Sequence, residues 1–265
     1  MTRTGAARSV PHVMSPLHSD LRIEPPQDVL DAARAWLHPV RAALGGEFLA
    51  AYLTGSVLTQ GFDPAHSKVN IVIVGRNLDV DVLDHVREAV PVTRKAPHFD
   101  PLLLSERQIH NSLDSFPIEW LEIRERHLTL EGDDVFAALQ VPNTYLRLQC
   151  EHELRAKHIL LRQAYLASGR KPLLLVDLLR GSASSFATLF RTLLRMRGEP
   201  APANHAQLIE KVAMLYRLDA EGLLGAHLVR YSGRKYKADE IVPIYRKFLA
   251  EVSRLVIAID TLRVP

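Results

Sequence analysis

The residues best suited to chemistry lie between Leu53 and Val74, where a Gly-Ser turn separates two apolar runs. Gly55 has no Cβ, so the backbone at this position can approach an anionic ligand closely. The Ser56 hydroxyl and the amides that open the next helical turn would supply hydrogen-bond donors. The turn is therefore a candidate phosphate site, although an ordinary turn at a strand end has the same sequence.

Lys68 and Asn70 open the second apolar run and, two residues apart on a strand, share one face. A lysine can neutralise a phosphate as a point charge, and Asn70 can offer one neutral oxygen to a cation. Magnesium usually requires one or two carboxylates. The pair therefore predicts phosphate binding without efficient metal catalysis. Alternatively, Lys68 is a solvated residue at the strand start and Asn70 lies on the outward face.

The Gly55-Ser56 turn followed by the run from Ser67 to Val74 resembles the DNA polymerase β-like nucleotidyltransferase superfamily. The likeness is to its small-acceptor branch, which includes aminoglycoside adenylyltransferases. There, a Ser-Asp-x-Asp pattern on the second strand holds divalent metal ions that bridge the triphosphate and the attacking oxygen. Lys68 and Asn70 replace the two acids. The resemblance implies ATP or another NTP as ligand and a small-molecule acceptor, with Asn70 at a degenerate metal position and magnesium binding in doubt.

A third acid is expected in a later strand, which we predict over Pro117 to Arg124. Alternation along that strand would place Glu119 and Glu122 on opposite faces, and the resemblance favours Glu119 as the catalytic acid. Both glutamates face solvent in the alternative interpretation. An active enzyme would have to recruit Glu119 or other acids, among them Asp63 and Asp100.

The helix predicted from Tyr145 to Ser168 carries further candidates. The resemblance implies that a glutamate of the helical domain takes a proton from the acceptor and that basic residues meet phosphate. Glu153 is the candidate catalytic base, beside Glu151, and Lys157 the candidate phosphate ligand. The alternative is that Glu151 with Arg155, and Glu153 with Lys157, form ordinary i,i+4 ion pairs.

The elements that would position these residues predict an α+β fold: a nucleotidyltransferase-like small mixed β-sheet with flanking helices, followed by an all-α helical bundle. We expect a flexible tail over 1–22, an α/β domain over 23–141 and a helical domain over 142–265. The expected strands are Phe48 to Thr54, Val69 to Val74 and Phe99 to Leu104, besides the one around Glu119. The expected helices are Pro26 to Leu44, Asp79 to Val90, a short one capped by Ser105, Tyr145 to Ser168, Leu173 to Arg197, Asn204 to Leu218 and Ile241 to Leu262.

The net charge of +3 conceals opposite halves. Residues 1–141 hold 13 basic and 19 acidic side chains, and residues 142–265 hold 20 and 11, giving −6 and +9. This division supports a boundary near Val141 and Pro142 and suggests that an anionic ligand is held partly from the C-terminal side.

Composition excludes several classes. The apolar content of 47% suffices for a sizeable core, and the apolar runs are far shorter than the roughly 20 residues of a membrane span. Met1 to Val13 lacks the apolar stretch of a secretory signal, so we expect a cytoplasmic protein without membrane partners. Cys150, the single cysteine, cannot form an internal disulfide.

The densest basic cluster, Arg230 to Lys237, is interleaved with Tyr231 and Tyr236. It could hold phosphates or a nucleic-acid backbone, or be a solvated loop between helices. Sequence-specific nucleic-acid recognition is not favoured.

Together these patterns favour a nucleotidyltransferase-fold protein that is catalytically impaired and binds a nucleotide or a partner. The first alternative is an active magnesium-dependent adenylyltransferase that modifies a small hydroxyl or amine acceptor with non-standard carboxylates. The second is an interaction protein whose helical half is the functional surface.

Overall fold

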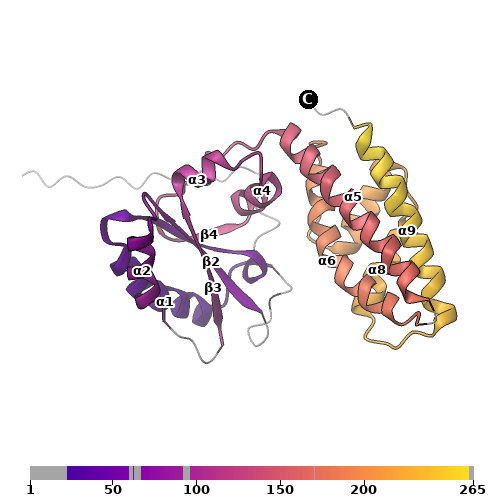
Figure 1. The fold of residues 1–265 in the computed structure, drawn as a ribbon, viewed down its shortest axis with the longest axis horizontal. Coiled ribbons are helices and arrows are strands. Elements are labelled where there is room, and N and C mark those ends of the chain that lie inside the picture. The colour runs from indigo at the N-terminus through magenta and orange to yellow at the C-terminus, as the bar shows by residue number, and fades with distance from the viewer. Residues whose placement is uncertain (1–22, 60–61, 63–66, 92–95, 170, 263–265) are drawn as a thin grey trace, which may run out of the picture.

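The computed structural model describes residues 23–59, 62, 67–91, 96–169 and 171–262, without the side chain of Ser184. Within them a small mixed sheet with flanking helices is followed by a region made of helices (Figure 1). The predicted tail over 1–22 lies outside the described residues. The first region, called the sheet region below, contains α1 (Gln27–Leu44), β1 (Phe48–Thr54), the 3-10 turn η2 (Gly55–Leu58), β2 (Lys68–Gly75), α2 (Val80–Ala89), β3 (His98–Ser105), α3 (Glu106–Asn111), α4 (Pro117–Glu125) and β4 (His127–Gly132).

The sheet has the strand order β3-β2-β1-β4, with β2 parallel to β3 and antiparallel to β1. Because side chains alternate along a strand, each strand feeds two cores. Leu53 and Ile71 pack towards α1. Tyr52 and Val72 lie on the other face, with Trp120 of α4. The two central strands, β1 and β2, are therefore buried on both faces over most of their length, which explains their nearly continuous apolar sequences.

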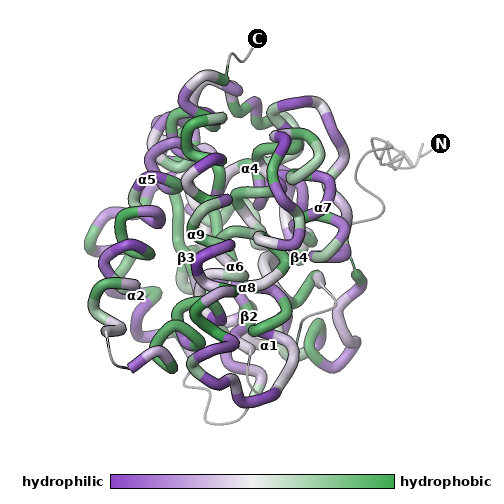
Figure 2. Tube along the Cα trace, turned by 90° about the vertical axis from the view of Figure 1, so that its right-hand side faces the viewer, coloured by the Kyte–Doolittle hydropathy of each residue, from purple (hydrophilic) through white to green (hydrophobic). Residues whose placement is uncertain are grey.

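The helical region is built on one continuous core. It contains α5 (Asn143–Ser168), α6 (Leu174–Arg195), α7 (His205–Tyr216), α8 (Ala220–Tyr231) and α9 (Ala238–Asp260). Hydrophilic and hydrophobic stretches alternate along its helices (Figure 2), as expected for amphipathic helices that bury one side. In the part of the chain that the structure describes, no helix has the length and apolar character to cross a membrane.

The predicted fold class is confirmed, and β1 has the predicted bounds. Ser105 caps α3 through a capping box with Gln108, as expected for a serine before a short helix. One further helix, α8, was not predicted. The domain boundaries stay predictions.

The prediction of a strand over Pro117 to Arg124 is wrong, because this segment belongs to helix α4. Pro117 stands at the start of the helix, a position that tolerates the missing amide. Ile118 and Leu121 pack into the helical core, whereas Trp120 packs against the sheet. Apolar and polar residues alternate along much of this segment because the helix is buried on two sides. The fourth strand is instead β4, directly after α4.

Candidate functional site

The Gly-Ser turn lies where β1 ends. Gly55 has φ +80, a conformation that side chains disfavour. A Cβ on Gly55 would stand 2.8 Å from Asn70 Nδ2, so the Asn70 side chain lies against the turn. Thr54, the last residue of β1, pairs with Asn70 in the sheet. The structure thus brings Gly55, the exposed Ser56 and Asn70 together.

Lys68 and Asn70 share a face of β2 with Val72 and Val74, which belong to the core beside α4. At this end of the strand both side chains are exposed. In the parallel pairing of β2 with β3, Asn70 stands opposite Asp100. Lys68 Nζ lies 3.2 Å from Asp100 Oδ2 and donates a hydrogen bond to it. The uncovered end of this sheet face therefore carries one carboxylate with its own ammonium partner.

This donor set fits a magnesium ion poorly. Magnesium prefers oxygen ligands and is usually held through one or two carboxylates, and here Asp100 is engaged by Lys68. Within the described ranges no group of three or more His, Cys, Asp or Glu side chains could hold a metal ion. Asp63, one of the acids that an active enzyme could recruit, lies outside the described residues.

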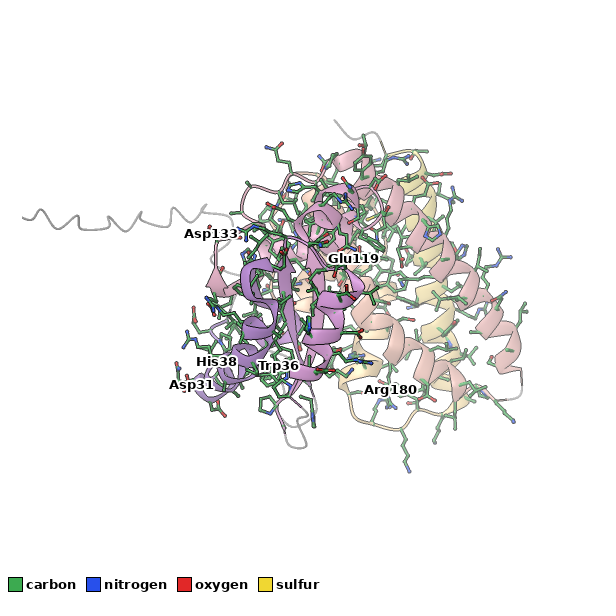
Figure 3. All side chains as sticks on the ribbon, turned by 60° about the vertical axis from the view of Figure 1, so that its left-hand side comes forward. Asp31, Trp36, His38, Glu119, Asp133 and Arg180 are labelled. Atoms are coloured by element: carbon green, nitrogen blue, oxygen red, sulfur yellow. The ribbon has the colours of Figure 1, made fainter. Side chains whose placement is uncertain are left out.

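Glu119 projects from the first turn of α4 and is exposed (Figure 3). Its carboxylate accepts hydrogen bonds from Gln149 Nε2 of α5 at 3.0 and 3.3 Å. Gln149 Oε1 also accepts from the Ile118 amide at 2.8 Å. Because α4 is a helix, Glu119 and Glu122, three residues apart, lie on the same side of it. The prediction that they lie on opposite faces of a strand is therefore wrong.

The charged residues of α5 form ion pairs along the helix. Lys157 Nζ lies 3.1 Å from Glu153 Oε2, and Arg155 Nε lies 3.1 Å from Glu151 Oε1. These are the i,i+4 pairs of the alternative interpretation. Among the described residues no hydrogen bond or ion pair joins Glu119, Glu153 or Lys157 to Lys68 or Asn70.

A buried group of charges between α4 and α6 had not been predicted. We name Arg126, Arg191 and Arg195 the arginine cluster. Glu122 Oε1 accepts from Arg195 Nη1 at 2.9 Å and from Arg191 Nε at 3.4 Å, and Arg126 contacts its other oxygen. The three arginine side chains are only 11 to 13% exposed. Burial, together with repulsion by Arg191 and Arg195, lowers the pKa of Arg126 to about 9.

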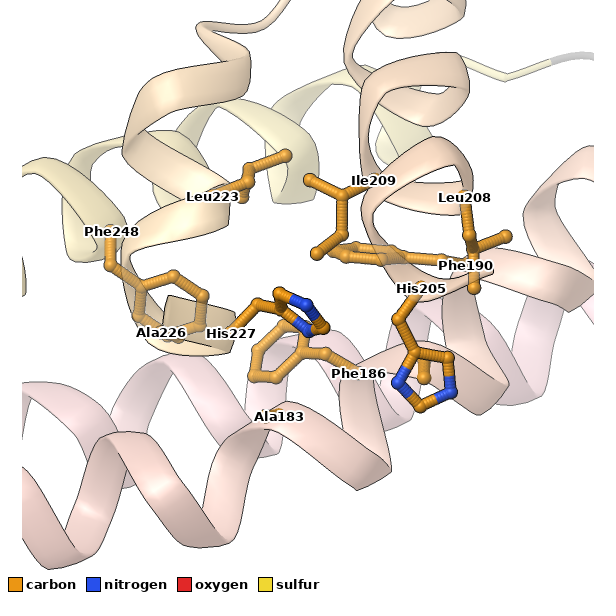
Figure 4. Close-up of a pocket in the computed structure, with 11 residues that line it drawn as sticks. Ala183, Phe186, Phe190, His205, Leu208, Ile209, Leu223, Ala226, His227 and Phe248 are labelled. Atoms are coloured by element: carbon orange, nitrogen blue, oxygen red, sulfur yellow. The ribbon is translucent and has the colours of Figure 1, made fainter. Parts of the chain in front are cut away.

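A small pocket in the helical region is lined in part by His205 and His227 (Figure 4). Its floor is apolar, with side chains such as Phe186, Phe190 and Leu223, and its volume is about 10 Å³. That volume accommodates at most one water molecule. Burial lowers the pKa of both histidines. The pocket as it stands cannot hold a nucleobase.

The basic stretch from Arg230 to Lys237 is largely engaged within its own surroundings. Arg234 Nη1 lies 2.9 Å from Glu240 Oε1, and its guanidinium stands 4.1 Å from the ring centroid of Tyr236. Arg230 Nη1 donates to the Arg180 carbonyl at 2.6 Å. These contacts are those of a connection between α8 and α9, as in the alternative interpretation of a loop between helices.

The small mixed sheet followed by a helical region resembles a fold that has been solved before. One similar solved structure is spectinomycin adenyltransferase AAD(9) from Enterococcus faecialis with ATP and spectinomycin. The match has a TM-score of 0.53 and 12% sequence identity, and it covers 86% of this chain and 98% of that one. At this identity the likeness establishes the fold. No protein-family model and no curated protein matches the sequence.

Proposed function

We propose that this chain binds a nucleotide on a nucleotidyltransferase-like fold and is impaired in metal-dependent transfer. The observation that carries the proposal is the 3.2 Å contact of Lys68 Nζ with Asp100 Oδ2, beside Asn70 and the Gly-Ser turn. An ammonium in place of a carboxylate changes the local charge by two units. At a few ångströms and an effective dielectric constant near 20, each unit charge pair is worth about 4 kcal/mol.

In this proposal residues of the Gly-Ser turn and of β2 bind the phosphate. The Gly55 backbone allows close approach, the Ser56 hydroxyl donates a hydrogen bond, and Lys68 neutralises the phosphate as a point charge. Lys68 can turn from Asp100 towards a phosphate because its side chain is 69% exposed. Asn70 supplies a neutral amide at the position where the resemblance implies a metal ligand.

The solved structure of spectinomycin adenyltransferase contains ATP and spectinomycin. Nucleotides and small hydroxyl- or amine-bearing acceptors are therefore the ligand classes to test. A second candidate function, an active adenylyltransferase, is favoured by one observation, that Asp100 lies in register with Asn70. In that case Asp100 would hold magnesium, with Glu119 as a further acid and Glu153 as the base released from Lys157.

Calorimetric titration with ATP, in magnesium and in EDTA, tests the proposal. We expect the wild-type protein to bind ATP with the same affinity in both buffers, because its site does not need the metal. The double variant Lys68→Asp, Asn70→Asp should instead bind ATP about tenfold more tightly with magnesium, since two carboxylates suit this ion. Lys235→Asp, at an exposed position of the helical region, is the matched control and should behave like the wild type.

Transfer of radiolabel from ATP to an acceptor panel supplies the opposing outcome. Turnover by the wild-type protein that Asp100→Asn abolishes would overturn the impairment and establish the active transferase. Absence of ATP binding in both buffers would contradict the proposed nucleotide binding. It would favour the alternative of an interaction protein whose helical half is the functional surface.

A further inference from the structure

A groove with a volume of about 340 Å³ lies between α8 and α9. Small-molecule sites in proteins have volumes of about 300 to 1,000 Å³. On α8 the groove is lined by Glu221, Gly225 and Leu228. The small pocket is lined instead by Leu223 and Ala226 of this helix (Figure 4). Because successive residues are about 100° apart around a helix, the two sets lie on different sides of α8, and the groove is a separate, larger cavity.

The middle of the groove is apolar. Gly225 of α8 and Ile244 of α9 both line it, and a Cβ on Gly225 would stand 2.8 Å from Ile244 Cγ2. The two helices therefore approach closely at this point. Leu228, which also lines the groove, is 61% exposed. Pro243 of α9 lines it as well and is exposed. These side chains offer an apolar surface to the body of a ligand.

The stability of α9 does not explain Pro243. It is the sixth residue of the helix, beyond the first turn in which proline is tolerated. At such a position proline is the least favourable residue, because it has no amide to donate to the carbonyl four residues earlier. A single exposed leucine is common on protein surfaces, but Leu228 lines the same groove as this proline. A ligand that covers both would bury apolar surface that is now in water.

Both ends of the groove carry a cation. At one end Lys247 Nζ lies 2.8 Å from Glu221 Oε1, and an ammonium has three donors, so it can hold a second carboxylate. At the other end Arg234 pairs with Glu240, and its guanidinium stands 4.1 Å from the ring centroid of Tyr236. Among the residues that line the groove, two cations stand against one carboxylate, that of Glu221. This balance favours an anionic ligand.

From these observations we infer that the groove binds a small aromatic carboxylate. The carboxylate accepts a hydrogen bond from Lys247, and the ring lies on Leu228 and Pro243. An aromatic ring suits the other end because a guanidinium such as that of Arg234 stacks on aromatic faces. The seven residues from Glu221 to Leu228 span about 10 Å of helix, which is about the length of a naphthalene ring with one carboxylate. The site belongs to the helical region alone and does not depend on nucleotide binding.

Calorimetric titration of the full chain with sodium 2-naphthoate and with the neutral 2-naphthamide tests the charge. We expect the wild type to bind the carboxylate about tenfold more tightly than the amide, because a charge-assisted hydrogen bond is stronger than a neutral one. Lys247→Gln should bind both compounds equally, and it should fold because the pair of Lys247 with Glu221 is exposed. Arg246→Gln, the adjacent exposed cation of α9, is the matched control and should keep the preference.

Leu228→Gln tests the apolar wall. It should weaken the binding of both compounds about tenfold, because the ring loses an apolar contact. Leu160→Gln on α5 is the matched control, since Leu160 is 63% exposed and Leu228 61%, and it should leave the binding unchanged.

Pro243→Ala separates binding from folding. Its melting temperature should rise, because alanine restores the missing amide to α9, whereas its affinity for 2-naphthoate should fall as the apolar contact is lost. Four results overturn the inference: no binding of either compound by the wild type, a preference for the carboxylate that survives in Lys247→Gln, or undiminished affinity for 2-naphthoate in Leu228→Gln or in Pro243→Ala.

Discussion

At the scale of single residues, the geometry around Gly55 and Asn70 constrains the candidate site most tightly. Gly55 combines φ +80 with a neighbour at 2.8 Å from any added Cβ, so both the backbone and the space require glycine. Asp100 belongs to the candidate site because it pairs with Asn70 across β2 and β3. Its signal in the sequence was only that of one acid among several.

Gly55→Ala should lower the free energy of unfolding by about 1 to 2 kcal/mol, because alanine is strained at this φ. Chemical denaturation measures the change. Gly55→Ala in an Asn70→Ala background should recover part of the loss, since the contact is then removed but the strain remains. Gly46→Ala, where a Cβ would meet nothing within 4 Å, is the control and should have little effect. If Gly55→Ala left the free energy of unfolding unchanged, the described conformation of the turn would be contradicted.

At the scale of elements, α4 with the following β4 organises the site. Its side chains enter the sheet core, the helical core and the arginine cluster. His127 fixes the start of β4: its Nε2 lies 3.0 Å from Asp134 Oδ1 and its Nδ1 lies 2.8 Å from the Ile123 carbonyl. Both ring nitrogens of His127 therefore face oxygen atoms that can accept a hydrogen bond.

This pair predicts an acid dependence of stability. Burial alone would raise the pKa of Asp134, but hydrogen bonds from His127 and from the amides of Phe136 and Ala137 lower it below 3.8. A carboxylate with a lowered folded pKa stabilises the protein above its unfolded pKa, and that contribution disappears as the pH falls through the folded value.

Asp134→Asn should therefore reduce the free energy of unfolding by about 1 to 3 kcal/mol at pH 7. The difference from the wild type should shrink below pH 3.8, as measured by urea unfolding across the pH range. Asp133→Asn, a change at an exposed neighbour (Figure 3), is the control and should change the free energy of unfolding at pH 7 by less than about 0.5 kcal/mol. An equal difference at all pH values would contradict the charge-based explanation.

At the scale of the whole molecule, the sheet region and the helical region are joined through α4, α5 and α6. The joint contains hydrogen bonds of Gln149 with Ile118 and Glu119, and the ion pairs of Glu122 and Glu125 with the arginine cluster. The opposite charges of the two halves thus meet, in part, as defined buried contacts rather than as a diffuse field.

Glu122→Gln should destabilise the protein by about 3 to 5 kcal/mol, because it leaves buried arginines without their shared carboxylate. Urea unfolding followed by the fluorescence of Trp36 and Trp120 measures the loss. Glu119→Gln, an exposed change on the same helix, should cost less than about 1 kcal/mol. Adding Arg191→Gln to Glu122→Gln should restore part of the lost stability. If Glu122→Gln left the free energy of unfolding unchanged, the contact between the two regions would not depend on these charges.

The sequence by itself determined the α+β class, β1, β2 and β3, the Gly-Ser turn and most long helices, because short-range periodicity and turn residues encode them. It also placed Lys68 and Asn70 on one face. Only the tertiary structure decided that Asp100 lies beside Asn70, that α4 is a helix buried on two sides, and that arginines from α6 join Glu122. These features depend on pairings between distant segments, which local patterns do not record.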